Sequence, residues 1–312
     1  MTQKASRKTP HWINRILHSE GLRALQHRNF RLFIFGQIIS VIGTWMQSTA
    51  QQWLVYDLTG SQLKLGTVTF AGFIPVLLFS LFLGILVDRL PRRTILLVTQ
   101  TLFMILAAIL AALTALGIVQ YWHIVFLAVM LGFVNALDMP TRQAFYIDLV
   151  SREDLMNAIA LNSSVFNVAR IVGPAAAGII VAAVGEAPAF AINSVTYLAV
   201  ILALLKITRP TRKPSPGKGK GFAELKEGLS YLIHTREMLG LVVMVAAFSM
   251  FGFTYLVLLP AVAVEILNTG PEGFGTLVAS QGVGALIGAV LLAVYGSRFH
   301  KGRMLQASRF LL

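Results

Sequence analysis

The stretch that decides the fold is LGTVTFAGFIPVLLFSLFLGILVDRLPRRTILL, residues 65–97. It begins with an apolar run, Gly66–Val87, that contains no charged residue. A helix needs about 20 such residues to cross the hydrocarbon core of a bilayer. The run ends in a turn with one acidic and three basic residues, DRLPRR (88–93). This pattern predicts a transmembrane helix followed by a charged turn.

The same pattern recurs along the chain. Apolar residues make up 56% of the 312 residues and charged residues only 12%, whereas a soluble domain is about a quarter charged. We therefore expect an all-α, polytopic helical membrane protein. Besides Gly66–Val87, the expected spans are 32–54, 95–116, 122–142, 158–184, 188–205, 239–264 and 275–296, and a ninth begins near Met304.

The basic residues predict the orientation of these spans. Of the 26 lysines and arginines, all but Lys64 and Arg170 fall in the leader, in alternate loops or in the tail. Basic loops stay in the cytoplasm, so the net charge of +13 is a topology signal and not a nucleic-acid footprint. We expect a multi-pass protein of the cytoplasmic (inner) membrane with a cytoplasmic N-terminus. The expected parts are a cytoplasmic basic leader (1–30), an N-terminal six-helix bundle (31–206), a cytoplasmic linker loop (207–237) and an incomplete C-terminal bundle (238–312).

An internal repeat supports this division. Residues 65–97 align without a gap over 274–306 at an offset of 209, so that Gly66 meets Gly275 and Arg92 meets Lys301. Duplicated halves with a site between them at the membrane midplane are a known transporter architecture. At this offset, the second half lacks part of one helix and three more. We therefore expect the chain to be a truncated or incomplete gene product.

The turn GILVDRLPRR (84–93) resembles the loop motif GxxxDRxGRR of the major facilitator superfamily, with Pro91 in place of the usual glycine. The basic cluster holds the loop in the cytoplasm, and Asp88 can pair with it or with a neighbouring helix N-terminus. The alternative is that the turn only determines topology. The resemblance implies a gating role for Gly84, Asp88, Arg89, Arg92 and Arg93.

A second motif lies in the span 158–184. The sequence ARIVGPAAAG (169–178) is similar to the GPxxGG motif of exporters in the superfamily, through Gly173, Pro174 and Gly178. Packing between helices is an equally good explanation, because small residues let helices approach closely. The run NALDMPTRQAFYIDLV (135–150) resembles the branch with the enterobactin exporter and macrolide efflux proteins. The resemblance implies the major-facilitator fold, with a complete six-helix half and about two and a third helices of the second half.

Charged residues inside spans are candidates for ion coupling. Arg170 lies deep within its span, where a charge is costly and normally faces a cavity or a partner. Asp138 and Arg142 are spaced four residues apart on the span 122–142. We expect Asp138 to be the proton-coupling acid, paired with Arg170; the alternative is a static ion pair that fixes two helices.

A polar stripe along the span 32–54 is the candidate substrate path. Its residues recur at helical spacing, although hydrogen bonding between helices would also explain them. The expected path residues are Gln37, Ser40, Thr44, Gln47, Gln51, Asn135 and Asn167.

Several other functions are disfavoured by the sequence. There is no nucleotide-binding GxxxxGK[ST] loop, no nucleophile–base pair and no metal-ligand cluster, so we expect neither an enzyme nor a cofactor. The prediction is a secondary transporter that exports small amphipathic molecules by alternating access, with protons as the coupling ion. The alternative is a non-transporting fragment or a membrane interaction partner.

Overall fold

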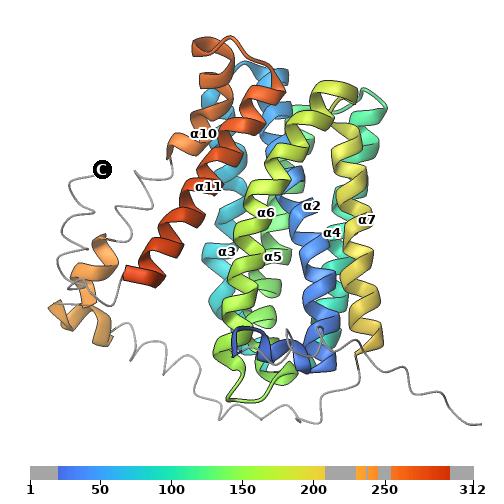
Figure 1. The fold of residues 1–312 in the computed structure, drawn as a ribbon. Helices are drawn as coiled ribbons and strands as arrows, with labels where there is room; N and C mark the ends of the chain where they lie inside the picture. Colours follow the sequence, from blue (N-terminus) through green and yellow to red (C-terminus); the bar gives the residue numbers. More distant parts are fainter. Residues whose placement is uncertain (1–19, 208–229, 237, 245–253, 296–312) are drawn as a thin grey trace, which may run out of the picture.

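The computed structural model describes residues 20–207, 230–236, 238–244 and 254–295. Every regular element named within these ranges is helical (Figure 1). The elements are η1 (Glu20–Gln26), α2 (Arg28–Thr59), α3 (Gln62–Arg89), α4 (Arg92–Ala115), α5 (Tyr121–Leu149), α6 (Leu155–Val184), α7 (Ala187–Lys206), α10 (Thr254–Ala261), η2 (Val262–Ile266) and α11 (Pro271–Tyr295).

Helices α2 to α7 form an upright bundle in which α2 contacts both α6 and α7. Helix α4 packs against α5 and α7, and α3 packs against α5. Among the described residues, six helices are long and apolar enough to cross a membrane, which confirms the six spans expected between residues 32 and 205. The outward faces carry exposed apolar side chains such as Leu77, Phe73 and Ile179, because lipid solvates these groups.

Helix α2 has the lowest mean hydropathy of the six spans and the largest buried share. Several of its polar side chains, among them Gln37, Ser40 and Gln47, are buried. Hydrocarbon offers no hydrogen bonds to polar groups, so the polar helix of the bundle occupies the inside. Helix α3 is more apolar and is the least buried of the six spans.

The later spans are described in part. Helix α10 and the π-helix η2 cover the end of the expected span 239–264, whose residues 245–253 lie outside the described ranges. Helix α11 covers the expected span 275–296 almost completely. The expected run from Met304, and most of the expected linker, also lie outside the described ranges.

Helix α5 is longer than the expected span 122–142 and continues past Arg142 to Leu149. Pro140 lies inside this helix without ending it. Neighbouring helices and side chains can satisfy the backbone groups that a proline frees within a membrane span. The extension brings Asp148 to the end of the bundle, where it accepts a hydrogen bond from Arg92.

The contacts agree with the repeat found in the sequence. Tyr56 donates a hydrogen bond to Glu265 (2.6 Å), and the two residues are separated by 209 positions, the offset of the repeat. Equivalent residues of two copies touch where a two-fold axis relates the copies. Helix α2 contacts α10 and α11, and α3 contacts α10, which is the set of contacts that such an axis requires.

The N-terminal element η1 is attached to the start of α6 and to the loop that precedes it. The backbone N–H of Ala24 donates to Asn157 (2.9 Å), and His27 lies 2.8 Å from a carboxylate oxygen of Asp154. The hydrogen bond with His27 is the main reason that the pKa of Asp154 falls below its ordinary value. The attachment places η1 at the same end of the bundle as the α3–α4 turn (Figure 1).

Close contact between α3 and α5 depends on Gly132. A Cβ atom at this position would lie 2.3 Å from the carbonyl oxygen of Gly72. We expect Gly132→Val to lower the free energy of unfolding in detergent by about 1–3 kcal/mol, the usual cost of overpacking. The matched control is Gly66→Val on α3, where an added Cβ meets nothing within 4 Å. Equal thermal stability of the two variants would contradict this packing.

Candidate functional site

The two ends of the bundle differ in charge. One end, which we call the acidic end, carries Asp57, Glu186, Glu265 and Glu272 in or beside its loops. The other, the basic end, carries the α3–α4 and α5–α6 turns, the start of α2 and the end of α7. At the acidic end, burial is the main reason that the pKa of Glu186 rises above its ordinary value.

Helices α6 and α11 touch closely through glycines toward the acidic end. A Cβ at Gly275 would lie 2.7 Å from the carbonyl oxygen of Pro174 and 2.8 Å from the Cα of Gly178. Farther along, a Cβ at Gly282 would lie 2.9 Å from the carbonyl oxygen of Arg170. We call this contact, from Gly178 and Gly275 to Arg170 and Gly282, the α6–α11 seam.

Two further contacts close the acidic end beside the seam. The rings of Trp53 on α2 and Phe274 on α11 stack with centroids 6.0 Å apart. The Tyr56–Glu265 hydrogen bond joins the end of α2 to η2. The aromatic stack and the charge-assisted hydrogen bond each stabilise the closed acidic end, in addition to the close packing of the glycines.

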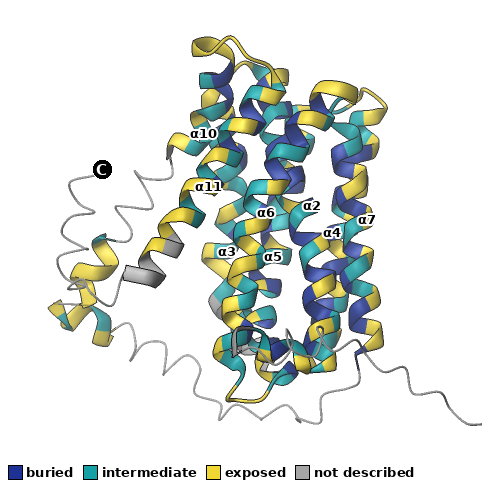
Figure 2. Cartoon of the chain, in the orientation of Figure 1, coloured by how far each residue is buried: buried dark blue, intermediate teal, exposed yellow. Residues whose placement is uncertain are grey.

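Toward the basic end, the two helices part. On α6, Ser164 is exposed and Asn167 is half-buried, although both continue the helical line of Ile171, Pro174 and Gly178 that faces α11. Figures 1 and 2 show α11 diverging from α6 in this direction, with mostly exposed and half-buried residues on its free part. The uncovered part of the α6 line is therefore polar, whereas the covered part is small and apolar.

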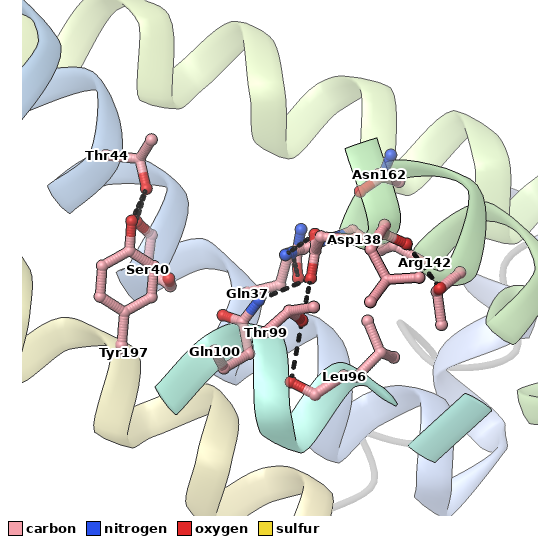
Figure 3. Close-up of polar contacts among 12 residues, drawn as sticks. Gln37, Ser40, Thr44, Leu96, Thr99, Gln100, Asp138, Arg142, Asn162 and Tyr197 are labelled. Atoms are coloured by element: carbon pink, nitrogen blue, oxygen red, sulfur yellow. Dashed lines mark hydrogen bonds and ion pairs between the residues drawn. The ribbon is translucent and has the colours of Figure 1, made fainter. Parts of the chain in front are cut away.

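A buried polar network connects α2, α4 and α5 on the basic side of the bundle (Figure 3). One carboxylate oxygen of Asp138 accepts hydrogen bonds from Thr99 (2.6 Å) and Gln100 (2.9 Å). The other accepts from Arg142 at 2.9 and 2.6 Å. Arg142 also donates to the side-chain oxygen of Gln37. Asp138 is almost fully buried, and these four hydrogen bonds match what an ionised carboxylate accepts.

The expected pair of Asp138 with Arg170 is not formed. Asp138 binds Arg142, one turn along the same helix, because the i and i+4 side chains of a helix lie on one face. Arg170 instead lies over the ring of Trp45, 5.7 Å from its centroid.

The polar stripe on α2 divides into two sets. Gln37, Ser40 and Gln47 are buried; Gln37 bonds Arg142, and Gln47 accepts a hydrogen bond from Asn193 of α7 (2.6 Å). Hydrogen bonding between helices, the alternative explanation, describes this set. Of the remaining path residues, Thr44 is exposed and Gln51, Asn135 and Asn167 are half-buried.

The basic turn holds three helices together at the basic end. Arg92 donates to Asp148 on α5 (3.0 Å) and to the carbonyl of Ala144 (3.1 Å). Arg93 donates to the carbonyl oxygens of Leu204 (2.6 Å) and Leu205 (3.1 Å) at the end of α7. Gly84 lies within α3, while the side chains of Asp88 and Arg89 lie outside the described part.

The motif on α6 makes close helix contacts. A Cβ at Gly173 would lie 2.5 Å from the Cβ of Trp45 on α2. Gly178 contacts α11 through Gly275, and the carbonyl oxygen of Pro174 faces Gly275. The motif thus packs α6 against helices of both halves.

Sequence reasoning missed several members of the buried network. Thr99 and Gln100 are the two polar residues beside Asp138, and Asn193 is the partner of Gln47. Each is a polar side chain within an apolar span, and this pattern in the sequence could have identified them as candidates.

A bundle of membrane-spanning helices, with polar residues inside and a seam between two parts, defines a multi-pass membrane transporter. The family model described as transmembrane secretion effector matches residues 19–312. The chain therefore belongs to this family of major-facilitator transporters.

Curated relatives carry transport names. The chain is 25% identical over 263 residues to the staphyloferrin A transporter of Staphylococcus aureus, an alignment that covers 84% of this chain and 66% of that protein. It is 22% identical to macrolide efflux protein A of Streptococcus pyogenes, with 92% and 72% covered. It is 29% identical to the putative bacilysin exporter BacE of Bacillus subtilis, with 88% and 69% covered. The chain thus spans about two thirds of the length of these relatives.

A solved structure shares the fold. It is the crystal structure of a bacterial homologue of the human lysosomal transporter Spinster in an inward-facing, unoccupied conformation. The TM-score is 0.67 at 13% identity, and the match covers 87% of this chain and 63% of the other.

The network around Asp138 predicts a large effect on stability. Removing one partner of a buried ion pair costs about 3–5 kcal/mol, so we expect Asp138→Asn to destabilise the chain by that order. Asp148→Asn is the matched control on α5, because the side chain of its partner Arg92 is 26% exposed and we expect a smaller loss. Thermal unfolding in detergent tests both variants. A loss for Asp138→Asn no greater than for Asp148→Asn would contradict the assigned network.

Proposed function

We propose that this chain forms part of a secondary exporter that moves small amphipathic molecules out of the cytosol by alternating access. The observation that carries the proposal is the α6–α11 seam, which is closed toward the acidic end and parts toward the basic end. A site reached from one side only is what alternating access requires, and rocking of the two halves exchanges the sides.

The direction of transport rests on the orientation. Basic loops face the cytoplasm in membrane proteins, so the basic end and the N-terminus lie in the cytoplasm of a cell with this protein in its inner membrane. The parted side of the seam then faces the cytosol, which would be an inward-facing state like that of the Spinster homologue. The names of the relatives, which include efflux proteins and an exporter, support outward transport.

For the driving ion, we propose protons, with Asp138 as the coupling acid. Asp138 is the one acidic residue among the buried polar residues of the described spans. A carboxylate beside Arg142 releases its cationic partner when it takes up a proton. Release of Arg142 would also break its bond to Gln37, and so would loosen α2 against α5.

The proposed gating role of the basic turn follows from the same contacts. Arg92 and Arg93 join α4 to α5 and α7, so the turn can keep the first half rigid while it rocks. The substrate path would run along the uncovered polar line of α6, with Asn167, and past Thr44 of α2.

Transport in everted membrane vesicles tests the proposal. We expect the chain to accumulate a fluorescent amphipathic dye when the vesicle interior is acidic, and to stop when a protonophore removes the pH gradient. Asp138→Asn should lower the gradient-driven rate at least about tenfold, because it removes the group proposed to take up the coupling proton, whereas Glu153→Gln, which replaces an exposed acid of the α5–α6 loop, should retain the rate.

Two outcomes would contradict the proposal. Equal gradient-driven rates for Asp138→Asn and the unaltered chain would remove Asp138 as the coupling acid. No dye movement at all, in a chain that is folded and inserted, would favour the membrane interaction partner.

A further inference from the structure

Arg170 and Trp45 form a pair at the point where α2, α6 and α11 come together. Arg170 lies at the centre of the 30-residue helix α6, and its guanidinium carbon is 5.7 Å from the centroid of the Trp45 ring. The contact of Gly173 with the Cβ of Trp45 fixes α6 against α2 one turn away. The carbonyl oxygen of Arg170 faces Gly282 of α11, at the point where the seam ends.

The charge of Arg170 is not compensated within the described part of the chain. No ion pair joins Arg170 to a described acidic residue, and its Nε is buried without a hydrogen-bond partner. Asp138, the acidic residue nearest to mid-span in the sequence, is already bound by Arg142, Thr99 and Gln100. The stretch 245–253, VAAFSMFGF, contains no acidic residue.

The surroundings of Arg170 are polar on one side and aromatic on the other. Asn167 and Ser163 are spaced three and seven residues before Arg170, on one face of α6, and Ser163 is exposed. Thr44, beside Trp45 on α2, is also exposed. Hydroxyl and amide groups therefore lie on the basic side of the Arg170–Trp45 pair.

We propose that Arg170 and Trp45 form the binding site for an amphipathic organic anion, and so name the substrate class of the proposed exporter. The guanidinium would bind a carboxylate or sulfonate through charge-assisted hydrogen bonds, for which its planar fork is suited. The flat apolar part of the ligand would pack against the Trp45 ring. A cationic ligand would be repelled by Arg170 and would meet no unpaired acid on the described face.

The test compares two ligands of one shape, 2-naphthoate and 2-naphthamide, on the full chain in nanodiscs of zwitterionic lipid. Isothermal titration calorimetry should give naphthoate a Kd at least about tenfold lower, since a hydrogen bond to a charged group is worth that factor. Arg170→Gln should raise the Kd of naphthoate to that of naphthamide. Arg170→Lys should keep part of the preference for naphthoate over naphthamide. The matched control is Arg152→Gln, an exposed arginine in the α5–α6 loop, which should leave the ratio unchanged.

Trp45→Leu should raise the Kd of both ligands by a similar factor and leave the ratio of the two Kd values unchanged. Equal Kd values for the two ligands on the unaltered chain would overturn the proposal, whatever the variants do. So would a preference for naphthoate that persists in folded Arg170→Gln.

This inference rests on the proposed function, but the two fail in different ways. Binding in nanodiscs needs no gradient and no turnover. Selective binding of naphthoate without any transport in vesicles would contradict the exporter and leave the anion site standing. Gradient-driven transport of a cationic dye, with equal Kd values for the two naphthalenes, would contradict the anion site and leave the exporter standing.

Discussion

The close approach of α6 and α11 through small residues is the contact on which the rest of the structure depends. Without side chains at Gly178 and Gly275, the two backbones meet within van der Waals distance, and lipid cannot enter between them. The last close glycine contact along this line is that of Gly282 with the carbonyl oxygen of Arg170. Beyond this point Ser164 of α6 is exposed, and the charged residue Arg170 lies at the boundary.

Contacts within the first half differ in kind from contacts between the halves. Inside the first half, Arg142, Arg92 and Arg93 link four helices through hydrogen bonds and ion pairs, which have few alternatives in hydrocarbon. Between the halves, the described contacts are glycine and apolar side-chain packing, one aromatic stack and the Tyr56–Glu265 hydrogen bond. The first half is thus suited to move as a rigid unit, and the junction between the halves is suited to separate.

The sequence was sufficient for the spans and the family, because apolar runs and motif spacing are local properties of the chain. It also identified Arg170 and Asp138 as charges inside spans. It did not predict their partners correctly. Asp138 can pair with Arg142 at any rotation of α5, because both lie on that helix. Whether it also reaches Arg170 of α6 depends on the rotation of α5 about its axis, and in the structure Asp138 faces Thr99 and Gln100 of α4. The burial of Gln37 and Gln47, in the middle of a stripe expected to line a path, depends in the same way on α5 and α7.

Thiol cross-linking tests the central claim most directly, because the chain contains no cysteine. Tyr56→Cys with Glu265→Cys spans the acidic end, whereas Asn167→Cys with Leu286→Cys continues the seam four residues beyond Ile171 and Gly282 on each helix. In the cargo-free chain, a short bifunctional maleimide should join the first pair quickly and the second pair slowly or not at all. Rapid joining of Asn167→Cys to Leu286→Cys, with the first pair unreacted, would contradict a junction that is closed at the acidic end and parted at the basic end.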